Sequence, residues 1–417
     1  TGPALQAALI AAIVIVTLAG LPLFAALGGL SLVLFWGSGT PLAAVPAETQ
    51  RLAANEMLPA IPLFTLAGHI VAAGGACRRL MRAFNALIGW LPGGLAIVAT
   101  LVFAFFASFT GGSGVTILSL GGLLLPVLVR SGYPERFGIG LLTAAGAIGL
   151  LFPPSLPVIL YGVRSLTQVN GVRYVARIDH LFIAGLVPGL FLVALVAAWG
   201  IRQARISNVR RRRFEPREAL AAVWDGKWEL AIPALVLVAI FGGFATLVEA
   251  AALTLVWAVF CECVVYRDLS VRRDLPRITA EGAALVGSVL LILGAALGLT
   301  NYLVDVRAPE VLAAFVQAHV GSRYLFLLLL NVFMLVVGSV IEIYSAILVV
   351  VPLVAPMGAA FGVDPVHLGI IFLANLELGY LFPPFGLNLL LSSSRFGRPL
   401  SVVIRDTMPF MLILQLG

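Results

Sequence analysis

The stretch Gly149-Leu-Leu-Phe-Pro-Pro154 returns later in the chain as Gly379-Tyr-Leu-Phe-Pro-Pro384, and both copies lie in apolar surroundings. Each proline removes a backbone donor and clashes with the preceding helical turn. It also pushes the residue before it out of the α region. Both motifs therefore predict breaks in hydrophobic helices, and their recurrence at corresponding places indicates an internal duplication.

The composition is that of an all-α polytopic membrane protein. Of 417 residues, 61% are hydrophobic and 11% are charged, and the mean hydropathy is +1.08, far outside the range of soluble domains. Apolar runs of about 20 residues recur, each long enough to cross the ~30 Å hydrocarbon core as a helix. The run near Thr1 lacks a basic flank and a cleavage site, so it is interpreted as a first span in the lipid bilayer.

The basic residues indicate membrane orientation. The net charge of +7 arises largely from short loops between apolar runs, where arginines mark the cytoplasmic side. The segment from Arg202 to Arg217 predicts a cytoplasmic linker over residues 201–228. A nucleic-acid patch is the alternative, but no soluble domain accompanies these residues, so no nucleic-acid partner is expected.

Residues 1–200 form the first predicted repeat. A helix at about 138–162 contains the first Pro-Pro break. The apolar stretch at about 92–129 is too long for one span, and Thr110-Gly-Gly-Ser-Gly114 interrupts it with residues of poor helix propensity. This stretch is either two crossings or a re-entrant hairpin with its tip inside the membrane. The remaining candidate spans of this half lie at about 4–19, 22–38, 57–76 and 181–200.

Residues 229–417 form the second predicted repeat and follow the same order. The second overlong stretch is at about 323–357, and the second broken helix is at about 369–394. The other candidate spans lie at about 230–246, 247–265, 282–302 and 400–417. The two halves match at an offset of 230 residues, which pairs Gly68 with Gly298, Pro126 with Pro356, Gly132 with Gly362, Ala144 with Ala374 and Gly149 with Gly379.

The arginines favour re-entrant hairpins and inverted repeats. If neither overlong stretch crosses the membrane, each half has five spans, and the halves have opposite orientation. This arrangement of about ten spans plus two re-entrant hairpins places Arg78, Arg79 and Arg82 inside, together with Arg395 and Arg398. Two full crossings per stretch would give parallel repeats, and that alternative remains open.

Four irregular segments are then predicted to meet near the midplane, where carbonyls freed by broken helices coordinate cations and helix N-termini favour anions. A cation beside an anion describes sodium-coupled uptake of a carboxylate. The candidate Na⁺ residues are Gly111, Gly112, Ser113, Gly114, Phe152, Pro153, Ser339, Glu342, Phe382 and Pro383. The candidate substrate-binding residues are Thr116, Ser155, Ser345 and Asn388.

Two acidic residues lie within apolar stretches, where ionisable groups are functional candidates. Glu342 is a candidate cation ligand, and Glu377 either acts directly or holds the broken helix together. The histidines show no spacing for a transition metal. A proton-coupled carrier, a channel and an intramembrane hydrolase using Ser113 with His69 are the alternatives. The hydrolase lacks a third orienting group, so no enzyme is expected.

Several motifs in order resemble the large membrane subunit of tripartite ATP-independent periplasmic (TRAP) transporters. They include the run from Leu58 to Gly68, the Gly/Ser tip, the Pro-Pro-Ser at 153–155 and Pro383-Pro384-Phe-Gly386. Phe152 and Phe382 stand where the family often has a hydroxyl residue before Pro-Pro, which leaves backbone carbonyls as the donors there.

The resemblance implies an elevator-type carrier of the ion-transporter superfamily in a bacterial inner membrane. It implies sodium sites formed by each hairpin tip with its partner broken helix. It also implies a separate small four-helix membrane subunit and a periplasmic substrate-binding protein that delivers a carboxylate such as a sialic acid or a C4-dicarboxylate.

Overall fold

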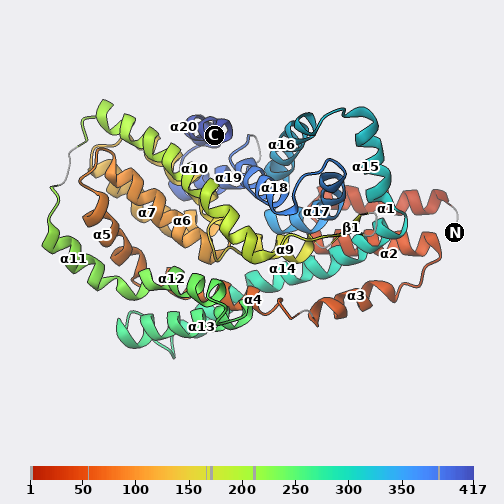
Figure 1. The fold of residues 1–417 in the computed structure, drawn as a ribbon, viewed down its shortest axis with the longest axis horizontal. Helices are drawn as coiled ribbons and strands as arrows, with labels where there is room; N and C mark the ends of the chain where they lie inside the picture. The colour runs from red at the N-terminus through yellow and green to blue at the C-terminus, as the bar shows by residue number, and fades with distance from the viewer. Residues whose placement is uncertain (1–2, 55, 166, 170–171, 210–212, 384–385) are drawn as a thin grey trace.

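The computed structural model describes residues 3–54, 56–165, 167–169, 172–209, 213–383 and 386–417. Helices dominate this part of the chain, as the composition predicts, and one antiparallel pair of short strands, β1 (Thr167–Val169) and β2 (Val172–Tyr174), interrupts them. Figure 1 shows the N-terminal helices at one end of the long axis and α5, α7 and α11 at the other. Pro384 and Phe385 of the second Pro-Pro motif, and Arg210–Arg212 of the linker, lie outside the described residues.

The helices of the first half follow the predicted order, with short additional helices. They are α1 (Pro3–Leu18), α2 (Leu23–Ser38), α3 (Ala44–Ala53), α4 (Ala60–Ala73), α5 (Ala76–Ile88), α6 (Gly94–Thr110), α7 (Ser113–Arg130), α8 (Glu135–Ile148) with the 3₁₀ turn Gly149–Leu151, α9 (Leu156–Arg164) and α10 (Ile178–Ile206).

The second half contains the corresponding series. Its helices are α11 (Pro216–Asp225), α12 (Lys227–Phe241), α13 (Leu247–Val259) with a π-helical end at Phe260–Val265, α14 (Asp274–Asp305), α15 (Ala308–His319), α16 (Arg323–Val340), α17 (Ile343–Ala360), α18 (Pro365–Gly379), α19 (Leu387–Phe396) and α20 (Leu400–Leu416).

The helices repeat at the offset found in the sequence. Adding 230 to the bounds of α7 gives residues 343–360, which are the bounds of α17. The same shift moves α6 onto α16, α8 onto α18 and α9 onto α19 to within two residues. The duplication is therefore a property of the fold as well as of the sequence, while the opposite orientation of the halves stays a prediction.

The repeated glycines before the breaks have equivalent packing. A Cβ added to Gly149 would lie 2.6 Å from the Ala104 carbonyl oxygen on α6, and one added to Gly379 would lie 2.7 Å from the Gly338 Cα on α16. Both glycines thus let a broken helix approach the first leg of the hairpin in its own half. Side chains of any size would separate these elements.

We expect Gly379→Ala to destabilise the protein by about 1–3 kcal/mol, because its methyl group overlaps backbone that cannot rotate away. The measurement is thermal unfolding of the purified protein in detergent. Gly287→Ala on α14 is the matched control, since nothing lies within 4 Å of a Cβ at Gly287. That control should be neutral or slightly stabilising. Equal losses for the two variants would contradict the packing argument.

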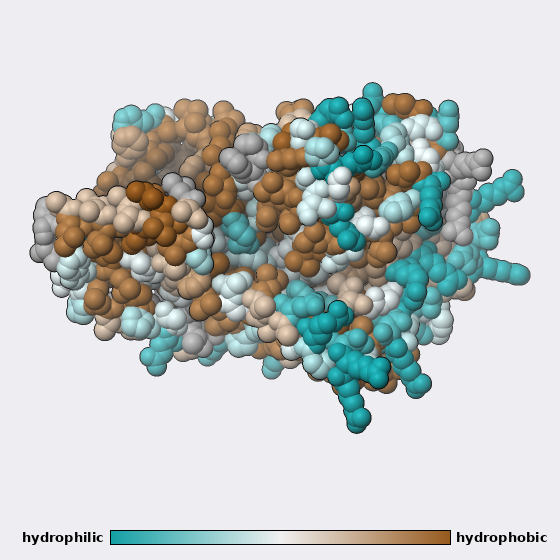
Figure 2. Space-filling view, turned by 180° about the vertical axis from the view of Figure 1, so that it is seen from behind, coloured by the Kyte–Doolittle hydropathy of each residue, from teal (hydrophilic) through white to brown (hydrophobic). Residues whose placement is uncertain are grey.

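The apolar surface agrees with a multi-pass membrane protein. Among the described residues, six helices are long and apolar enough to cross a membrane, or up to eight if each of two bent pairs counts as one span. Three of the six are legs of the predicted hairpins, α7, α16 and α17, so length alone does not separate crossing from re-entry. Figure 2 shows broad apolar areas on the surface. The prediction of about ten spans stays a prediction.

Several short helices were not predicted. A bend of 75° separates α4 from α5, so the predicted span at about 57–76 ends early and the basic segment after it is itself a helix. The α5 helix is strongly amphipathic, which is why a search for continuous apolar runs passes over it. Part of the predicted linker is also helical: it contains α11, which packs against α5.

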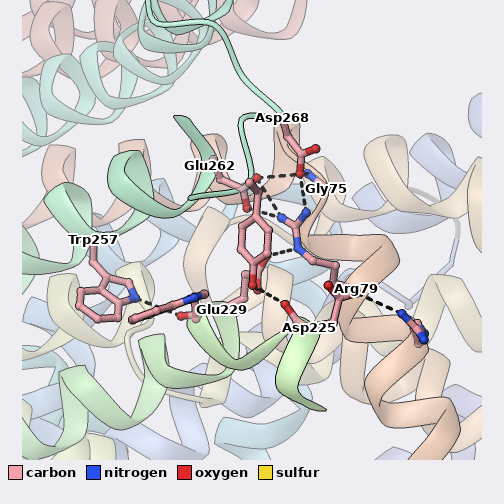
Figure 3. A network of polar contacts seen from close by, with 10 residues as sticks. Gly75, Arg79, Asp225, Glu229, Trp257, Glu262 and Asp268 are labelled. Atoms are coloured by element: carbon pink, nitrogen blue, oxygen red, sulfur yellow. Dashed lines mark hydrogen bonds and ion pairs between the residues drawn. The ribbon is translucent and has the colours of Figure 1, made fainter. Parts of the chain in front are cut away.

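A buried ion-pair network joins α5 to α12 and the end of α13. Arg79 is 7% exposed and contacts the carboxylates of Glu229, Glu262 and Asp268, of which the two glutamates are 0% exposed. Figure 3 shows its guanidinium between these acids, which come from three separate segments. The Gly75 amide donates to Glu262 at 3.2 Å and to Asp268 at 3.1 Å. Arg79 was predicted only as a marker of the cytoplasmic side, and its buried pairing is a finding of the structure.

Tyr266 completes the network. Its ring lies under the Arg79 guanidinium with 3.6 Å between the Cζ atom and the ring centroid, a favourable cation–π geometry. Burial is the main cause that raises the pKa of the Tyr266 phenol, and nearby Glu229 raises it further. The phenol therefore stays protonated and donates to the Asp225 carbonyl, with the Glu229 carboxylate at 3.0 Å as a second acceptor.

Candidate functional site

The first hairpin tip is the two-residue turn between α6 and α7. Gly111 ends α6 with φ of 70°, a conformation that favours glycine, and Gly112 is extended before Ser113 begins α7. The two legs contact each other. This places Gly111, Gly112, Ser113 and Gly114 at a helical break, as predicted.

The hydroxyl groups near this tip are buried and mostly bonded within it. Thr116 Oγ1 lies 3.2 Å from Thr110 Oγ1 and donates to the Gly112 carbonyl at 3.3 Å. Ser113 differs, because its hydroxyl donates to Asn388 Oδ1 at 2.8 Å across 275 residues of sequence. The tip is therefore fixed from within and by its contact with Asn388 in the other half of the chain.

The first break separates α8 from α9. Phe152 is extended, and its ring packs on Gly189 of α10. Ser155 occupies the N-cap position of α9, but its side chain makes no capping hydrogen bond. Pro153 is buried beside it. Ser155 is 0% exposed, and its Oγ has no hydrogen-bond partner among the described residues. Since buried hydroxyls normally have partners, Ser155 is a candidate for binding a species that the chain itself does not supply.

The second tip lies between α16 and α17. Glu342 caps α17, and its carboxylate accepts from the Tyr344 amide at 3.1 Å and from the Ser345 amide at 3.3 Å. Ser339 bonds back to the Val336 carbonyl at 2.7 Å, which is common for helical serines. The legs diverge from the tip: α16 packs mainly against α18, whereas α17 packs against α9, α14 and α15.

The second break follows α18. The Phe382 amide donates to the Gly379 carbonyl at 2.9 Å, and the Phe382 carbonyl accepts from the Gly386 amide at 3.1 Å. Phe382 and Pro383 are half-buried. The Asn388 side chain on α19 is fully buried, accepts from Ser113, and donates to the Thr143 carbonyl at 3.4 Å. The Phe382 carbonyl thus already accepts one hydrogen bond, which leaves one of its two lone pairs.

Each tip lies between the two broken helices. The first tip contacts α8 of its own half and α19 of the other, while the second hairpin contacts α18 of its own half and α9 of the other. The structure therefore brings together three predicted residues, Gly111, Ser113 and Asn388, with the second tip. The sequence predicted that the four irregular segments meet near the midplane, but it did not predict which residues join the two halves.

Glu377 is buried, as its place within an apolar stretch suggested. Its side chain is 2% exposed, and Oε1 has no hydrogen-bond partner among the described residues. No hydrogen bond from this carboxyl group across the break of its own helix is observed there, and its role stays a prediction. His69, the proposed base of the hydrolase alternative, instead bonds the Thr65 carbonyl in its own helix at 2.9 Å.

Sequence reasoning missed two tyrosines at the second tip. The Tyr344 phenol donates to the Gly111 carbonyl, and the Ile343 amide donates to the Tyr380 phenolic oxygen. Both tyrosines are buried, at 3% and 2% exposure. The sequence offered a signal for both tyrosines. The positions 230 residues earlier are Gly114 and Leu150, so these two hydroxyl groups occur in the second half without counterparts in the first.

The groups gathered here have a consistent chemistry. The polar atoms of both tips and both breaks are carbonyl, hydroxyl, amide and carboxylate oxygens with backbone N–H groups, and Glu342 supplies a negative charge. Oxygen donors suit hard cations. The N-terminal ends of α7, α9, α17 and α19 lie at the same irregular segments and carry partial positive charge. Such convergence of discontinuous helices is typical of membrane transport proteins.

The comparisons with known proteins identify the family. The family described as "Tripartite ATP-independent periplasmic transporter, DctM component" matches residues 9–417, and this chain belongs to it. The chain is 36% identical over 358 residues to the C4-dicarboxylate TRAP transporter large permease protein DctM of Pseudomonas aeruginosa, covering 86% of this chain and 82% of that protein. It is 29% identical over 417 residues to the ectoine TRAP transporter large permease protein TeaC of Halomonas elongata, covering 98% and 94%. The chain is accordingly a transporter subunit and not an enzyme.

A solved structure shares the fold. The Alcanivorax borkumensis YdaH transporter superposes with a TM-score of 0.62 at 16% sequence identity, over 87% of this chain and 83% of that chain. At this identity the likeness concerns the fold alone. It agrees with the helical architecture of this chain.

Proposed function

We propose that this chain is the translocating subunit of a sodium-coupled carrier that imports a small organic anion. The observation that carries the proposal is the set of contacts at the first tip. It meets α19 after the second break through Ser113 with Asn388, and the second tip through Gly111 with Tyr344. Gly111 also lies close to Leu156, where α9 begins after the first break. Irregular backbone at membrane depth is tolerated where it is buried in protein or lines a cavity. A set of oxygen donors at such a place suits a transported cation.

Two cation sites follow from the pairing of tips and breaks. The first cation site consists of Gly111, Gly112, Ser113 and Gly114 with Phe152 and Pro153. The second cation site consists of Ser339 and Glu342 with Phe382 and Pro383. Backbone carbonyls are the main donors at both sites, because the phenylalanines before each Pro-Pro have no side-chain oxygen. Glu342 makes the second site the more strongly charged of the two.

The anion binds where the helix N-termini converge. Ser113 and Asn388 are bonded across the halves at 2.8 Å, and Ser155 has a buried hydroxyl without a partner among the described residues. Thr116, Ser155, Ser345 and Asn388 are the proposed substrate-binding residues. A C4-dicarboxylate, named for the P. aeruginosa relative, or a sialic acid has the negative charge that such a site favours. Carboxylates are stabilised at helix N-termini.

Transport proceeds by an elevator movement in this proposal. The transport domain contains both tips and both broken helices, α6–α9 and α16–α19, which pack on one another. The scaffold contains α14, which packs against α2, α3 and α4, and α13, which packs on α4. The ion pairs of Arg79 tie α5 to α12 and α13, so this helix stays with the scaffold while the transport domain slides.

The complete transporter has further components. The family name denotes a tripartite periplasmic system, and we assign the other two parts to a small four-helix membrane subunit and a periplasmic binding protein that delivers the anion. The chain then resides in a bacterial inner membrane, with the 201–228 linker on the cytoplasmic side. The basic residues of that linker support this orientation.

The test is reconstitution of the chain with its small subunit and binding protein in proteoliposomes. Radiolabelled succinate and a radiolabelled sialic acid serve as probes, chosen by which acid the binding protein retains. An inward sodium gradient should accelerate uptake at least about tenfold over potassium alone. Uptake that ignores sodium but follows an inward proton gradient would establish the proton-coupled alternative and refute sodium coupling. Unsaturable flux would establish a channel.

A further inference from the structure

A single residue contacts both cation sites. Tyr344 lies at the start of α17, where its backbone amide donates to the Glu342 carboxylate of the second site at 3.1 Å. Its phenol reaches the other hairpin and donates to the Gly111 carbonyl of the first site. The side chain is 3% exposed, so water does not compete for either bond. The two sites are thus joined by one side chain and one backbone amide.

The surroundings hold Tyr344 in this position. The amide of the preceding residue, Ile343, donates to the Tyr380 phenolic oxygen of the second break. At the other end, a Cβ added to Gly111 would lie 2.9 Å from the Tyr344 hydroxyl and 3.0 Å from the Leu156 Cβ. Gly111 also has a φ of 70°, which other residues rarely adopt. The phenol therefore fills a gap that exists only while Gly111 keeps its turn.

The bond from Tyr344 to the other tip has no counterpart at the corresponding position of the first half, which is a glycine. The position of Tyr344 corresponds to Gly114 in the first half, and that of Tyr380 corresponds to Leu150. The helices around these positions repeat to within two residues, so the asymmetry belongs to the side chains and not to the backbone plan. The two tips can form without the hydrogen bond between Tyr344 and Gly111, because the backbone plan of each half is the same. The bond therefore points to a functional connection between the tips.

We propose that Tyr344 is a positioning residue that couples the two cation sites, so that sodium at one tip favours sodium at the other. Sodium at the first site orders the Gly111 carbonyl, which is the acceptor of the phenol. The ordered phenol holds the Tyr344 amide against Glu342 and so completes the second site. By thermodynamic linkage the effect is equal in both directions. This inference rests on the proposed sodium coupling.

The test measures sodium alone. Equilibrium binding of ²²Na⁺ to the purified chain with its small subunit should be cooperative for the wild-type protein, with a Hill coefficient approaching about 2 for two coupled sites. Tyr344→Phe keeps the ring and removes only the hydroxyl. Its Hill coefficient should fall to about 1, and its half-saturating sodium concentration should rise about fivefold or more. A purely structural role would lower the thermal stability without changing the shape of the isotherm.

Two further variants sharpen the result. Tyr380→Phe alters the same tip but leaves the Tyr344–Gly111 bond, so it should remain cooperative. Gly111→Ala strains the turn of the first site itself, so it should weaken sodium binding as well as cooperativity. The wild-type isotherm keeps the test valid even if a variant folds poorly. A cooperative Tyr344→Phe, or a wild-type protein that binds sodium without cooperativity, overturns the coupling and leaves sodium transport intact. Absence of ²²Na⁺ binding by the wild-type protein refutes the proposed function itself.

Discussion

Arg79→Met is expected to lower the stability of the protein by about 3–5 kcal/mol, the usual consequence of removing one partner from a buried ion pair. Methionine preserves the apolar stem but removes all the guanidinium donors. Glu229, Glu262 and Asp268, which surround Arg79 in the wild-type protein, would then face one another without a counter-charge. Thermal unfolding of the purified protein in detergent is the measurement.

Glu262→Gln is the matched control for this variant. It changes one of the three carboxylates that Arg79 contacts, and glutamine still offers an oxygen to the Gly75 amide that donates to Glu262 at 3.2 Å. Because the wild-type network has one cation for three acids, removing an acid improves the balance of charge. We therefore expect a much smaller loss than for Arg79→Met. Equal losses would show that packing, and not charge, determines the stability of this region.

The local breaks of the fold could be predicted from sequence because their causes are local. Proline removes a donor within its own turn, so the interruption after α8 falls at the predicted place, and glycine at 111 accepts the φ of 70° that the first tip needs. The duplication was equally accessible, since α7 and α17 have bounds that differ by the sequence offset of 230.

The contacts between halves could not be predicted in this way. Ser113 and Asn388 are 275 residues apart, and nothing in either local pattern specifies which broken helix a tip will contact. Arg79 is a second case, because a basic residue beside an apolar run is ordinarily exposed at the membrane surface. Its three acidic partners lie on α12, at the end of α13 and in the loop after it, all distant in sequence. Only the tertiary fold therefore distinguishes it from its exposed neighbour Arg78.

Glu342→Gln is expected to produce the largest loss of sodium binding without loss of fold. In the structure the carboxylate accepts two backbone amides at the start of α17, from Tyr344 at 3.1 Å and Ser345 at 3.3 Å. Glutamine can accept from the same amides, so the cap is retained while the charge is lost. Hydrogen bonds to charged groups contribute about 1.5–3 kcal/mol, and loss of a charged ligand on this scale corresponds to about 10- to 150-fold weaker binding.

The comparison with Glu342→Ala separates the two roles of this residue. Alanine removes the cap as well as the charge, so it should lower the thermal stability by about 0.5–2 kcal/mol, whereas glutamine should leave stability nearly unchanged. Both variants should bind ²²Na⁺ weakly. If Glu342→Gln binds sodium as the wild-type protein does, the carboxylate serves only as a helix cap. The charge at the second tip would then have no part in cation binding, and the carbonyls of the break would have to suffice.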